Sequence, residues 1–456
     1  MIKNVGGLIG TSTYVQEIMK KFFVSMGLAV AGTASIHAAY APDLGPLSST
    51  KIWNVSATLR GFYDDNYSTA NTANNPRGSY GFEVSPQLML AVPLQQTELG
   101  LRGSYALTYY QERQDLGQNP IDQSGQVDLW VDHAFTERWQ AKVMDTFVVS
   151  TEPELSSTVP TAFPFRVEEN YIYNTANITL NTDWTRLFST SLNYENTVYY
   201  YQNSGATIAD VQPGGKGASL AGLLNRVHQA ISLDLKWLVA SETIFLIGSS
   251  FDWVNYTGNE PIASNPSGIG PAIYYSDNRN ARGYTGYVGA QHNFLPNLNV
   301  SVKAGATYAD SYNDPNSSPS VSPYADMSAV YTYNPGCYVQ LGFVSGLNAT
   351  DISQVNASNG KLTLYQESSV LSASINHLIT PKLLGSLIGT WQFSTYYEGA
   401  YNDQMDNYYT LGLNLSYTFN PHFSAEMGYN YDTVGSNINQ RGYDRNRVYL
   451  GVTAAY

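Results

Sequence analysis

The stretch of sequence that decides the fold is residues 408–419, which read YYTLGLNLSYTF. Leucines at every second position alternate with small and polar residues. Successive side chains of a β-strand point to opposite faces, so this alternation predicts a strand with one apolar face and one polar face. Residues 226–238 divide in the same way, which makes the pattern a property of more than one segment.

The alternation recurs in about eighteen segments after residue 50. Asp145 interrupts it, because this residue falls on the apolar face of its segment. Residues 361–379 change phase midway, which indicates a bulge or a misplaced boundary. The predicted strands begin near residues 51, 78, 97, 124, 139, 170, 186, 225, 243, 281, 298, 323, 337, 361, 383, 406, 423 and 445.

The connections between these segments alternate between tight turns and long polar loops. The tight turns lie at residues 136–138, 295–297, 334–336, 380–382 and 420–422. The long loops include residues 202–224, 257–280 and 313–322. Short periplasmic turns and longer extracellular loops are typical of outer-membrane barrels. We therefore expect an all-β fold, a transmembrane antiparallel up-and-down β-barrel of about 18 (16–18) strands, with both chain ends on the short-turn side.

Aromatic residues occur at both ends of the predicted strands. The pairs Tyr109-Tyr110, Tyr396-Tyr397 and Tyr408-Tyr409 and the run at residues 199–201 adjoin long loops. Two aromatic girdles around an apolar band mark the two headgroup layers of a membrane. The residues that flank the tight turns are Phe135, Trp139, Phe294, Phe419 and Phe423.

The last segment alternates up to the final residue, Tyr456, with apolar residues at every second position before it. This ending resembles the C-terminal signature that presents bacterial outer-membrane barrels to their assembly machinery. The lipid bilayer and, through residues 445–456, that machinery are therefore the expected partners. The apolar outward faces would also allow a homo-oligomer.

The N-terminal part predicts export from the cytoplasm. Lys20 and Lys21 precede an apolar run at residues 22–31, and small residues follow it, which is the order of a secretory signal peptide. We assign residues 1–41 to this signal, with an alternative start at Met19. Residues 42–50 are then a short periplasmic segment, and residues 51–456 form the barrel in the bacterial outer membrane.

The composition excludes several other classes of protein. The chain has 456 residues, with 23 Lys and Arg against 36 Asp and Glu, so its net charge of −13 argues against a nucleic-acid partner. A single cysteine, Cys337, excludes an internal disulfide framework. The six histidines show no metal-ligand spacing, and no G-x-S-x-G motif occurs. We therefore expect no enzyme activity and no cofactor.

Two short stretches near the start carry a family resemblance. Residues 59–66 read LRGFYDDN and residues 82–86 read FEVSP. This opening is similar to that of the putative β-barrel porin type 2 family of Gram-negative bacteria. The resemblance implies an outer-membrane barrel and says little about activity. Asp64 and Asp65 in this run are interpreted as a solvated strand end, with a loop cation site as the alternative.

The polar faces of the predicted strands define a candidate pore lining. Barrels of 16–18 strands leave an aqueous lumen, so we expect a porin-like channel for passive diffusion of small hydrophilic solutes. The alternative is a non-conducting or plugged barrel that serves surface polysaccharide export or adhesion through its loops. The predicted pore-lining residues are Arg60, Glu83, Arg102, Asp128, Asp132, Lys142, Glu195, Arg226, Asp234, Lys236, Lys303, Glu426 and Arg447, with Glu98 as a further inward charge.

These inward charges have two interpretations. Opposed charges could set a field across a constriction, and the acidic surplus would then favour cations. The favoured interpretation is that the charges pair across adjacent strands and only satisfy the polar lumen. Four inward aromatic residues, Tyr173, Tyr287, Tyr449 and Trp130, could form a track for sugars, and the loops at residues 202–224 and 257–280 are long enough to narrow the lumen.

Overall fold

The structure is a computed structural model that describes residues 52–151, 170–439 and 441–456. The signal peptide predicted for residues 1–41 and the periplasmic segment predicted for residues 42–50 lie outside the described residues.

Eighteen long strands form one sheet. They are β1 (Trp53–Asp64), β2 (Ser79–Pro93), β3 (Thr97–Tyr110), β4 (Ile121–Ala134), β5 (Trp139–Ser150), β6 (Tyr171–Asp183), β7 (Phe188–Tyr201), β8 (Arg226–Ala240), β9 (Thr243–Tyr256), β12 (Ala281–Leu295), β13 (Leu298–Asp310), β14 (Ser320–Asn334), β15 (Cys337–Ala349), β16 (Tyr365–Thr380), β17 (Leu383–Tyr397), β18 (Met405–Asn420), β19 (Phe423–Ser436) and β20 (Tyr443–Ala455).

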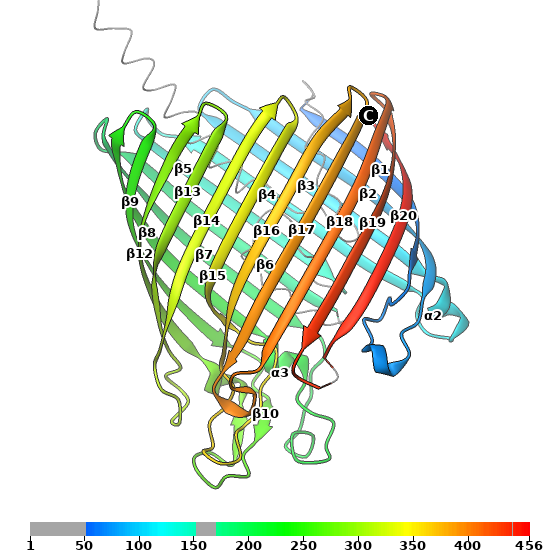
Figure 1. Ribbon diagram of the computed structural model, residues 1–456, viewed down its shortest axis with the longest axis vertical. Coiled ribbons are helices and arrows are strands. Elements are labelled where there is room, and N and C mark those ends of the chain that lie inside the picture. Colours follow the sequence, from blue (N-terminus) through cyan, green and yellow to red (C-terminus); the bar gives the residue numbers. More distant parts are fainter. Residues whose placement is uncertain (1–51, 152–169, 440) are drawn as a thin grey trace, which may run out of the picture.

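Each of these strands pairs in antiparallel fashion with the next one along the chain, and β1 also pairs with β20. The sheet is therefore a closed barrel, which leaves no unpaired strand edge (Figure 1). This result confirms the predicted fold class and strand count. The largest error in a predicted strand start is at residue 361, because that strand begins four residues later, at Tyr365.

The phase change predicted within residues 361–379 has its cause in this boundary. Residues 361–364 belong to a loop, and from Gln366 to Asn376 every second residue except Ser372 is buried. Pairing with β17 is regular from Tyr365 to Leu378. The segment therefore contains a misplaced boundary and no bulge in its middle.

The long loops contain all the remaining regular structure of the described residues. These elements are η1 (Thr72–Asn74), α2 (Gln111–Asp115), α3 (Leu220–Leu224), η2 (Ser276–Arg279), η3 (Gly399–Tyr401) and the hairpin of β10 (Pro261–Ser264) and β11 (Ile273–Tyr275). Short helices therefore occur within the long loops. Within the described ranges, no helix combines the length and hydrophobicity of a membrane span.

The two ends of the barrel differ as predicted. All five predicted tight turns connect neighbouring strands at one end, and the long loops, with α3 and β10, gather at the other (Figure 1). β1 begins and β20 ends on the short-turn side, where the rings of Trp53 and Tyr456 lie 5.4 Å apart. The first and last strands of the described barrel therefore start and finish at the same end of the barrel, the short-turn end.

The outer face of the barrel is apolar and the inner face is polar. Leu59 is 52% exposed on β1, whereas its neighbour Arg60 is 1% exposed. On β18, Leu411, Leu413 and Leu415 are exposed, and Asn414 between two of them is buried. A soluble protein buries its leucines and exposes its charges. The reversed distribution is the one that a lipid-facing barrel requires.

The aromatic residues follow the same alternation. Phe135, Phe294, Phe419 and Phe423 are exposed beside the tight turns. At the long-loop end, each tyrosine pair is divided between the two faces. Tyr200 and Tyr409 are exposed on the outer face, whereas their neighbours Tyr201 and Tyr408 are buried on the inner face. Fewer than half of these tyrosines can therefore contribute to an outer girdle.

Candidate functional site

The candidate site is the inner wall of the barrel together with the loops across its long-loop end. All thirteen predicted lining residues share the phase of their strands that faces the inside of the barrel. Arg60, Glu83, Arg102, Asp128, Arg226, Lys236 and Arg447 are buried. Asp132, Lys142, Glu195, Asp234, Lys303 and Glu426 are partly exposed.

Arg60 is the centre of a charged group on β19, β20, β1 and β2. Its Nη1 donates to Glu83 Oε1 at 2.9 Å, directly across the β1–β2 pair. Its Nη2 donates to Glu426 Oε1 at 2.6 Å, across the intervening strand β20. The residue of β20 between them is Gly451, and a Cβ there would lie 3.0 Å from Glu426 Oε1. Because Gly451 has no side chain, Arg60 and Glu426 can reach each other across β20.

A second close pair joins β3 to β4. Arg102 Nε donates to Asp128 Oδ2 at 2.9 Å, again between residues in direct register. Asp128 also accepts hydrogen bonds from Gln126 Nε2 and, at 2.9 Å, from Thr146 Oγ1 of β5. These two groups follow the favoured interpretation, in which inward charges pair across neighbouring strands.

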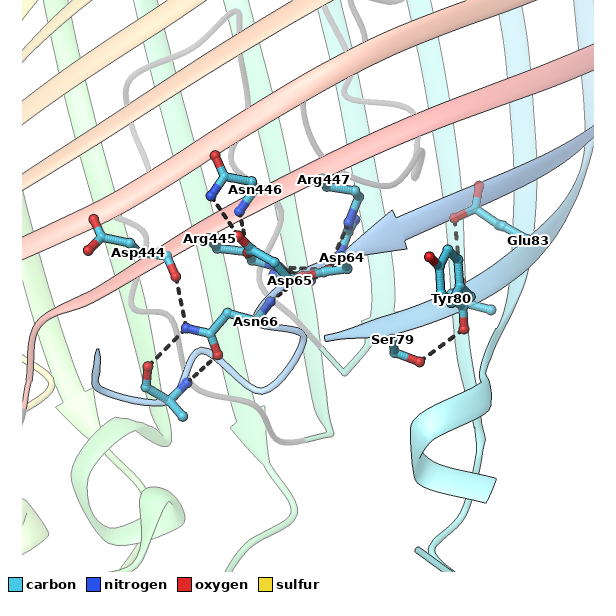
Figure 2. A network of polar contacts seen from close by, with 12 residues as sticks. Asp64, Asp65, Asn66, Ser79, Tyr80, Glu83, Asp444, Arg445, Asn446 and Arg447 are labelled. Carbon is cyan, nitrogen blue, oxygen red and sulfur yellow. Dashed lines mark hydrogen bonds and ion pairs between the residues drawn. The ribbon is translucent and has the colours of Figure 1, made fainter. Parts of the chain in front are cut away.

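The Tyr-Asp-Asp-Asn run closes the barrel at its long-loop end. Asp64 is completely buried and accepts hydrogen bonds from Arg445 Nε at 2.7 Å and from Arg447 Nη2 at 2.8 Å. Figure 2 shows these side chains between the ends of β1 and β20. Asp65 accepts hydrogen bonds from the backbone N–H and side-chain amide of Asn446, both at 2.7 Å.

Asn66 completes this junction through the following loop. Its Nδ2 donates to Asp444 O at 2.8 Å and to Ala70 O at 2.9 Å. The interpretation of Asp64 as a solvated strand end is therefore wrong, because the first strand uses this carboxylate to hold the last strand. Within the part of the chain that the structure describes, no group of three or more His, Cys, Asp or Glu side chains is arranged to hold a metal ion.

A different arrangement occupies the opposite wall, from β8 to β14. Lys236, Leu246, Gly289, Lys303 and Asp326 form one registered row across these five strands. Lys303 Nζ lies 3.9 Å from Asp326 Oδ2, at the limit of an ion pair. Lys236 makes no ion pair or side-chain hydrogen bond to any residue of the described ranges. The ammonium groups of this wall are thus only loosely neutralised.

The adjacent row on this wall is aromatic. The Tyr287 hydroxyl donates to Asp234 Oδ1 at 2.7 Å across Gly248, where an added Cβ would lie 2.2 Å from the tyrosine ring. The rings of Tyr287 and Tyr324 are 5.4 Å apart, and Lys303 Nζ lies 5.2 Å from the Tyr287 ring. Tyr287 therefore lies along the wall with a carboxylate at one end and an ammonium group over it.

The four aromatic residues predicted as a sugar track lie on separate strands. Ring contacts in the described residues join Tyr173 to Tyr199 and Tyr287 to Tyr324, and none joins two of the predicted four. Trp130 covers Gly100, where a Cβ would lie 1.8 Å from its ring.

Loops from opposite sides of the barrel meet across the long-loop end. Arg279, in the β9–β12 loop, donates through Nη1 to Leu223 O of the β7–β8 loop at 2.7 Å, and its Nη2 donates to Thr350 O of the β15–β16 loop. The next residue, Asp351, pairs with Arg441 of the β19–β20 loop at 2.8 Å. We call these contacts the loop bridge.

The loop bridge is anchored at both ends. Arg441 Nε donates to Asp406 Oδ2 at 2.6 Å, at the start of β18. On the other side, Arg226 donates to Leu224 O at 3.0 Å and stacks on Tyr199 at 4.0 Å. Burial lowers the pKa of Arg279 below its ordinary value, although the nearby Asp351 opposes this effect. Both predicted loops, 202–224 and 257–280, take part in the bridge, as does the loop at 350–364.

Sequence reasoning missed most of the residues that hold the β1–β20 junction and the loop bridge, and placed only Arg226 and Arg447 of them on the inner face. Asp64 and Arg445 could have been found, because both fall on the inward phase of strands that must pair if the barrel closes. Arg279, Asp351 and Arg441 lie in loops, where no periodicity indicates a direction. Of the remaining predicted charges, Asp132 and Glu195 make local contacts. Gln140 donates to Asp132 at 2.6 Å, and Thr197 donates to Glu195 at 3.2 Å.

Comparison with known proteins supports a porin-like barrel of the outer membrane. The family model described as putative beta-barrel porin 2 matches residues 272–456. This match confirms the predicted family resemblance for the part of the chain that ends in β20. The two stretches on which the prediction rested, residues 59–66 and 82–86, lie outside the matched range. No curated protein matches the chain.

Solved structures of other barrels resemble this one only distantly. The outer membrane protein OpdK from Pseudomonas aeruginosa is 9% identical, with a TM-score of 0.41, over 89% of this chain and 99% of that one. OccAB4 from Acinetobacter baumannii is 12% identical, with a TM-score of 0.42, over the same shares. The siderophore receptor PirA from Pseudomonas aeruginosa is 11% identical, with a TM-score of 0.40, over 88% of this chain and 80% of that one. We draw no functional argument from likenesses at this level.

Proposed function

Starting from a porin-like outer-membrane barrel, we propose that the protein is a channel through which small hydrophilic solutes diffuse passively. The observation that carries the proposal is the reversed distribution of side chains, with leucines exposed outside and charges buried inside a closed ring of 18 strands. A barrel of this size encloses more space than its own side chains fill. Water and small solutes would occupy the remainder.

The pore lining in this proposal consists of the thirteen inward charges. Arg60 and Arg102 pair closely with three carboxylates, those of Glu83, Glu426 and Asp128, so these five residues leave one net negative charge for a passing ion. The loosely neutralised residues of the opposite wall, Lys236 and Lys303, would then have the larger influence on ion selectivity. The lipid bilayer and, through β20, the barrel assembly machinery remain the proposed partners.

Reconstitution tests this function directly. Refolded protein in planar bilayers should give stable open channels, and liposomes that contain it should swell in sugar solutions at rates that fall with increasing sugar size. Heat-denatured protein serves as the control. Folded protein that neither conducts nor admits any sugar would contradict the proposal.

The loop bridge favours a second candidate, a plugged barrel that serves surface polysaccharide export or adhesion through its loops. The contacts from Leu223 through Arg279 and Asp351 to Arg441 connect loops on opposite sides of the mouth. Such a connection could narrow the lumen or block it.

The variant Arg441→Ala separates the two candidates. It cuts the ion pairs of Arg441 with Asp351 and with Asp406 and leaves the pairing of the barrel strands unchanged. If the native protein conducts and the variant conducts more, the bridge is a constriction of a diffusion channel. If only the variant conducts, the native barrel is plugged. Lys361→Ala is the matched control, because it cuts an ion pair of 2.8 Å between neighbouring loops, with Glu398, and leaves the bridge in place.

A further inference from the structure

The outward residue Asp145 lies within the apolar band of the barrel. On β5, exposed Val143 precedes it and exposed Phe147 and Val149 follow it on the same face. Outward charges such as Arg282 and Asp310 lie instead at the loop ends of their strands. The sequence marked Asp145 as an exception to the alternation, and the structure places it where lipid would surround it.

Four further outward residues on β6 and β7 surround Asp145. Asn174 Nδ2 donates to Asp145 Oδ1 at 3.0 Å and to Thr146 O at 3.2 Å. Ala176 pairs in register with Asp145, and Asn196 pairs with Ala176. Tyr194 lies on the same face, two residues from Asn196. We call Asp145, Asn174, Ala176, Tyr194 and Asn196 the β5–β7 polar patch.

The polar patch has more hydrogen-bonding groups than its own contacts satisfy. Within the described residues, the Tyr194 hydroxyl and the Asn196 amide make no side-chain hydrogen bond. Asp145 has one hydrogen-bond donor, the Asn174 amide. Hydrocarbon can supply no donor or acceptor, so groups that face it stay unsatisfied unless protein covers them.

The tilt of the strands brings a donor to the height of Asp145. Its registered row runs from Trp53, at the short-turn end of β1, to Asp310, at the long-loop end of β13. Along this row, the registered residue of each successive strand from β1 to β13 therefore lies closer to the long-loop end than the one before it. Tyr194 is two residues nearer the short turn than Asn196, which returns it to about the height of Asp145. Ala176 lies between the two on β6.

We propose that this patch is a two-fold interface between two copies of the chain, side by side in the same membrane. A two-fold axis along the membrane normal, close to Ala176, exchanges the positions of Asp145 and Tyr194. Asp145 of each copy then accepts a hydrogen bond from Tyr194 of the partner subunit, so one patch supplies both acceptor and donor. The small side chain of Ala176 lets the two walls approach at the axis.

Cysteine cross-linking in membranes tests the proposal. Ala176→Cys is made in a Cys337→Ser background, which removes the one native cysteine. Oxidation, or a short bismaleimide, should convert most of the protein into covalent dimers on a denaturing gel. Ala304→Cys, an exposed outward position on β13, is the matched control and should remain monomeric. Adding Asp145→Asn or Tyr194→Phe should reduce the dimer fraction several-fold.

Three results would overturn the proposal. The first is a folded Ala176→Cys protein that stays monomeric with both reagents. A ring in which each copy contacts its neighbours through two different patches would give this result, and so would a patch covered by lipid. The second is equal cross-linking at positions 176 and 304, which indicates random collision. The third is a dimer fraction that neither Asp145→Asn nor Tyr194→Phe changes. Tyr194→Phe removes only a hydroxyl, so it keeps the test valid if Asp145→Asn fails to fold.

Discussion

Two walls of the lumen carry inward charges in the same alternating pattern but arrange them differently. On the wall from β19 through β1 to β4, Arg60 and Arg102 lie 2.6–2.9 Å from their carboxylate partners. On the wall from β8 to β14, Lys303 is 3.9 Å from the nearest carboxylate, and Lys236 has no ion pair within the described residues. Alternation decides which residues face the lumen, and register and side-chain reach decide whether their charges are neutralised.

The two walls also differ in the residues that lie between their charges. Arg60 and Glu426 are separated by Gly451, so the guanidinium can cross one strand and meet the carboxylate. Lys236 and Lys303 are like charges separated by Leu246 and Gly289. The first wall is therefore expected to contribute mainly stability, and the second mainly interactions with solutes.

The largest loss of stability is expected at the junction of β1 and β20 in the first wall. Asp64→Ala removes the buried carboxylate that Arg445 and Arg447 share, and loss of one partner of a buried ion pair costs about 3–5 kcal/mol. Urea unfolding in lipid vesicles, followed by the heat-dependent gel shift, measures this loss. Asp310→Ala is the control, because its half-exposed contact with Arg282 at 3.7 Å should contribute about 1 kcal/mol or less. Equal losses of stability for the two variants would contradict this account of the β1–β20 junction.

A smaller loss is expected for Arg102→Met on the same wall. Asp128 keeps its hydrogen bonds from Gln126 and Thr146, so the cost should lie near the lower limit of about 3 kcal/mol for a broken buried pair. The same urea titration measures it. The double variant Arg102→Met and Asp128→Asn removes both charges of this neutral pair, so ion selectivity should change little. A large change in reversal potential would show that the first wall also acts on ions.

The double variant Lys236→Met and Lys303→Met should change ion selectivity more than stability. Stability should change by less than about 1 kcal/mol, because no close ion pair is lost. The reversal potential in a salt gradient should move toward cation selectivity, because two positive charges leave the lumen. Lys216→Met, at an exposed loop position, is the control. A selectivity shift as large for Lys216→Met would remove the distinction between the walls.

The smallest effect concerns Asp314, in the loop between β13 and β14. Burial raises the pKa of its carboxyl above the ordinary value, and the Glu398 carboxylate raises it further, against a hydrogen bond from the Asn316 backbone N–H. Its Oδ2 is buried without a hydrogen-bond partner among the described residues. Folding of the loop thus shifts the equilibrium of this carboxyl toward its protonated form.

The sign of the pH dependence follows from this direction. The contribution of Asp314 is complete below the ordinary Asp value of about 3.9 and is lost as the pH rises through the higher folded pKa. Hydrogen exchange in residues 311–319, corrected for intrinsic rates, should therefore reveal a looser loop at higher pH. Asp314→Asn should flatten this dependence, whereas Asp115→Asn at an exposed position should not. A loop that tightens as the pH rises would contradict the prediction.

The strands could be predicted from the sequence because their signal is local. A lipid-facing strand must alternate along its own length, so residues 408–419 are sufficient to recognise β18. The inward direction of Arg60 or Lys236 follows from the same phase. The contacts between these residues depend on register, which the sequence does not show. The loop bridge depends on loop paths for which residues such as Asp351 and Arg441 carry no periodic signal.

The pairing of β1 with β20 has a consequence for how the molecule is made. Asp64 and Arg445 are separated by 381 residues, so their contact is among the most distant in the chain. During synthesis the first strand has no lateral neighbour on one side until the last strand has been translated and exported. A chain cut short before β20 would keep two strand edges with unpaired backbone N–H and C=O groups, and it would remain open to proteases. Only a chain that includes β20 can therefore close the cylinder.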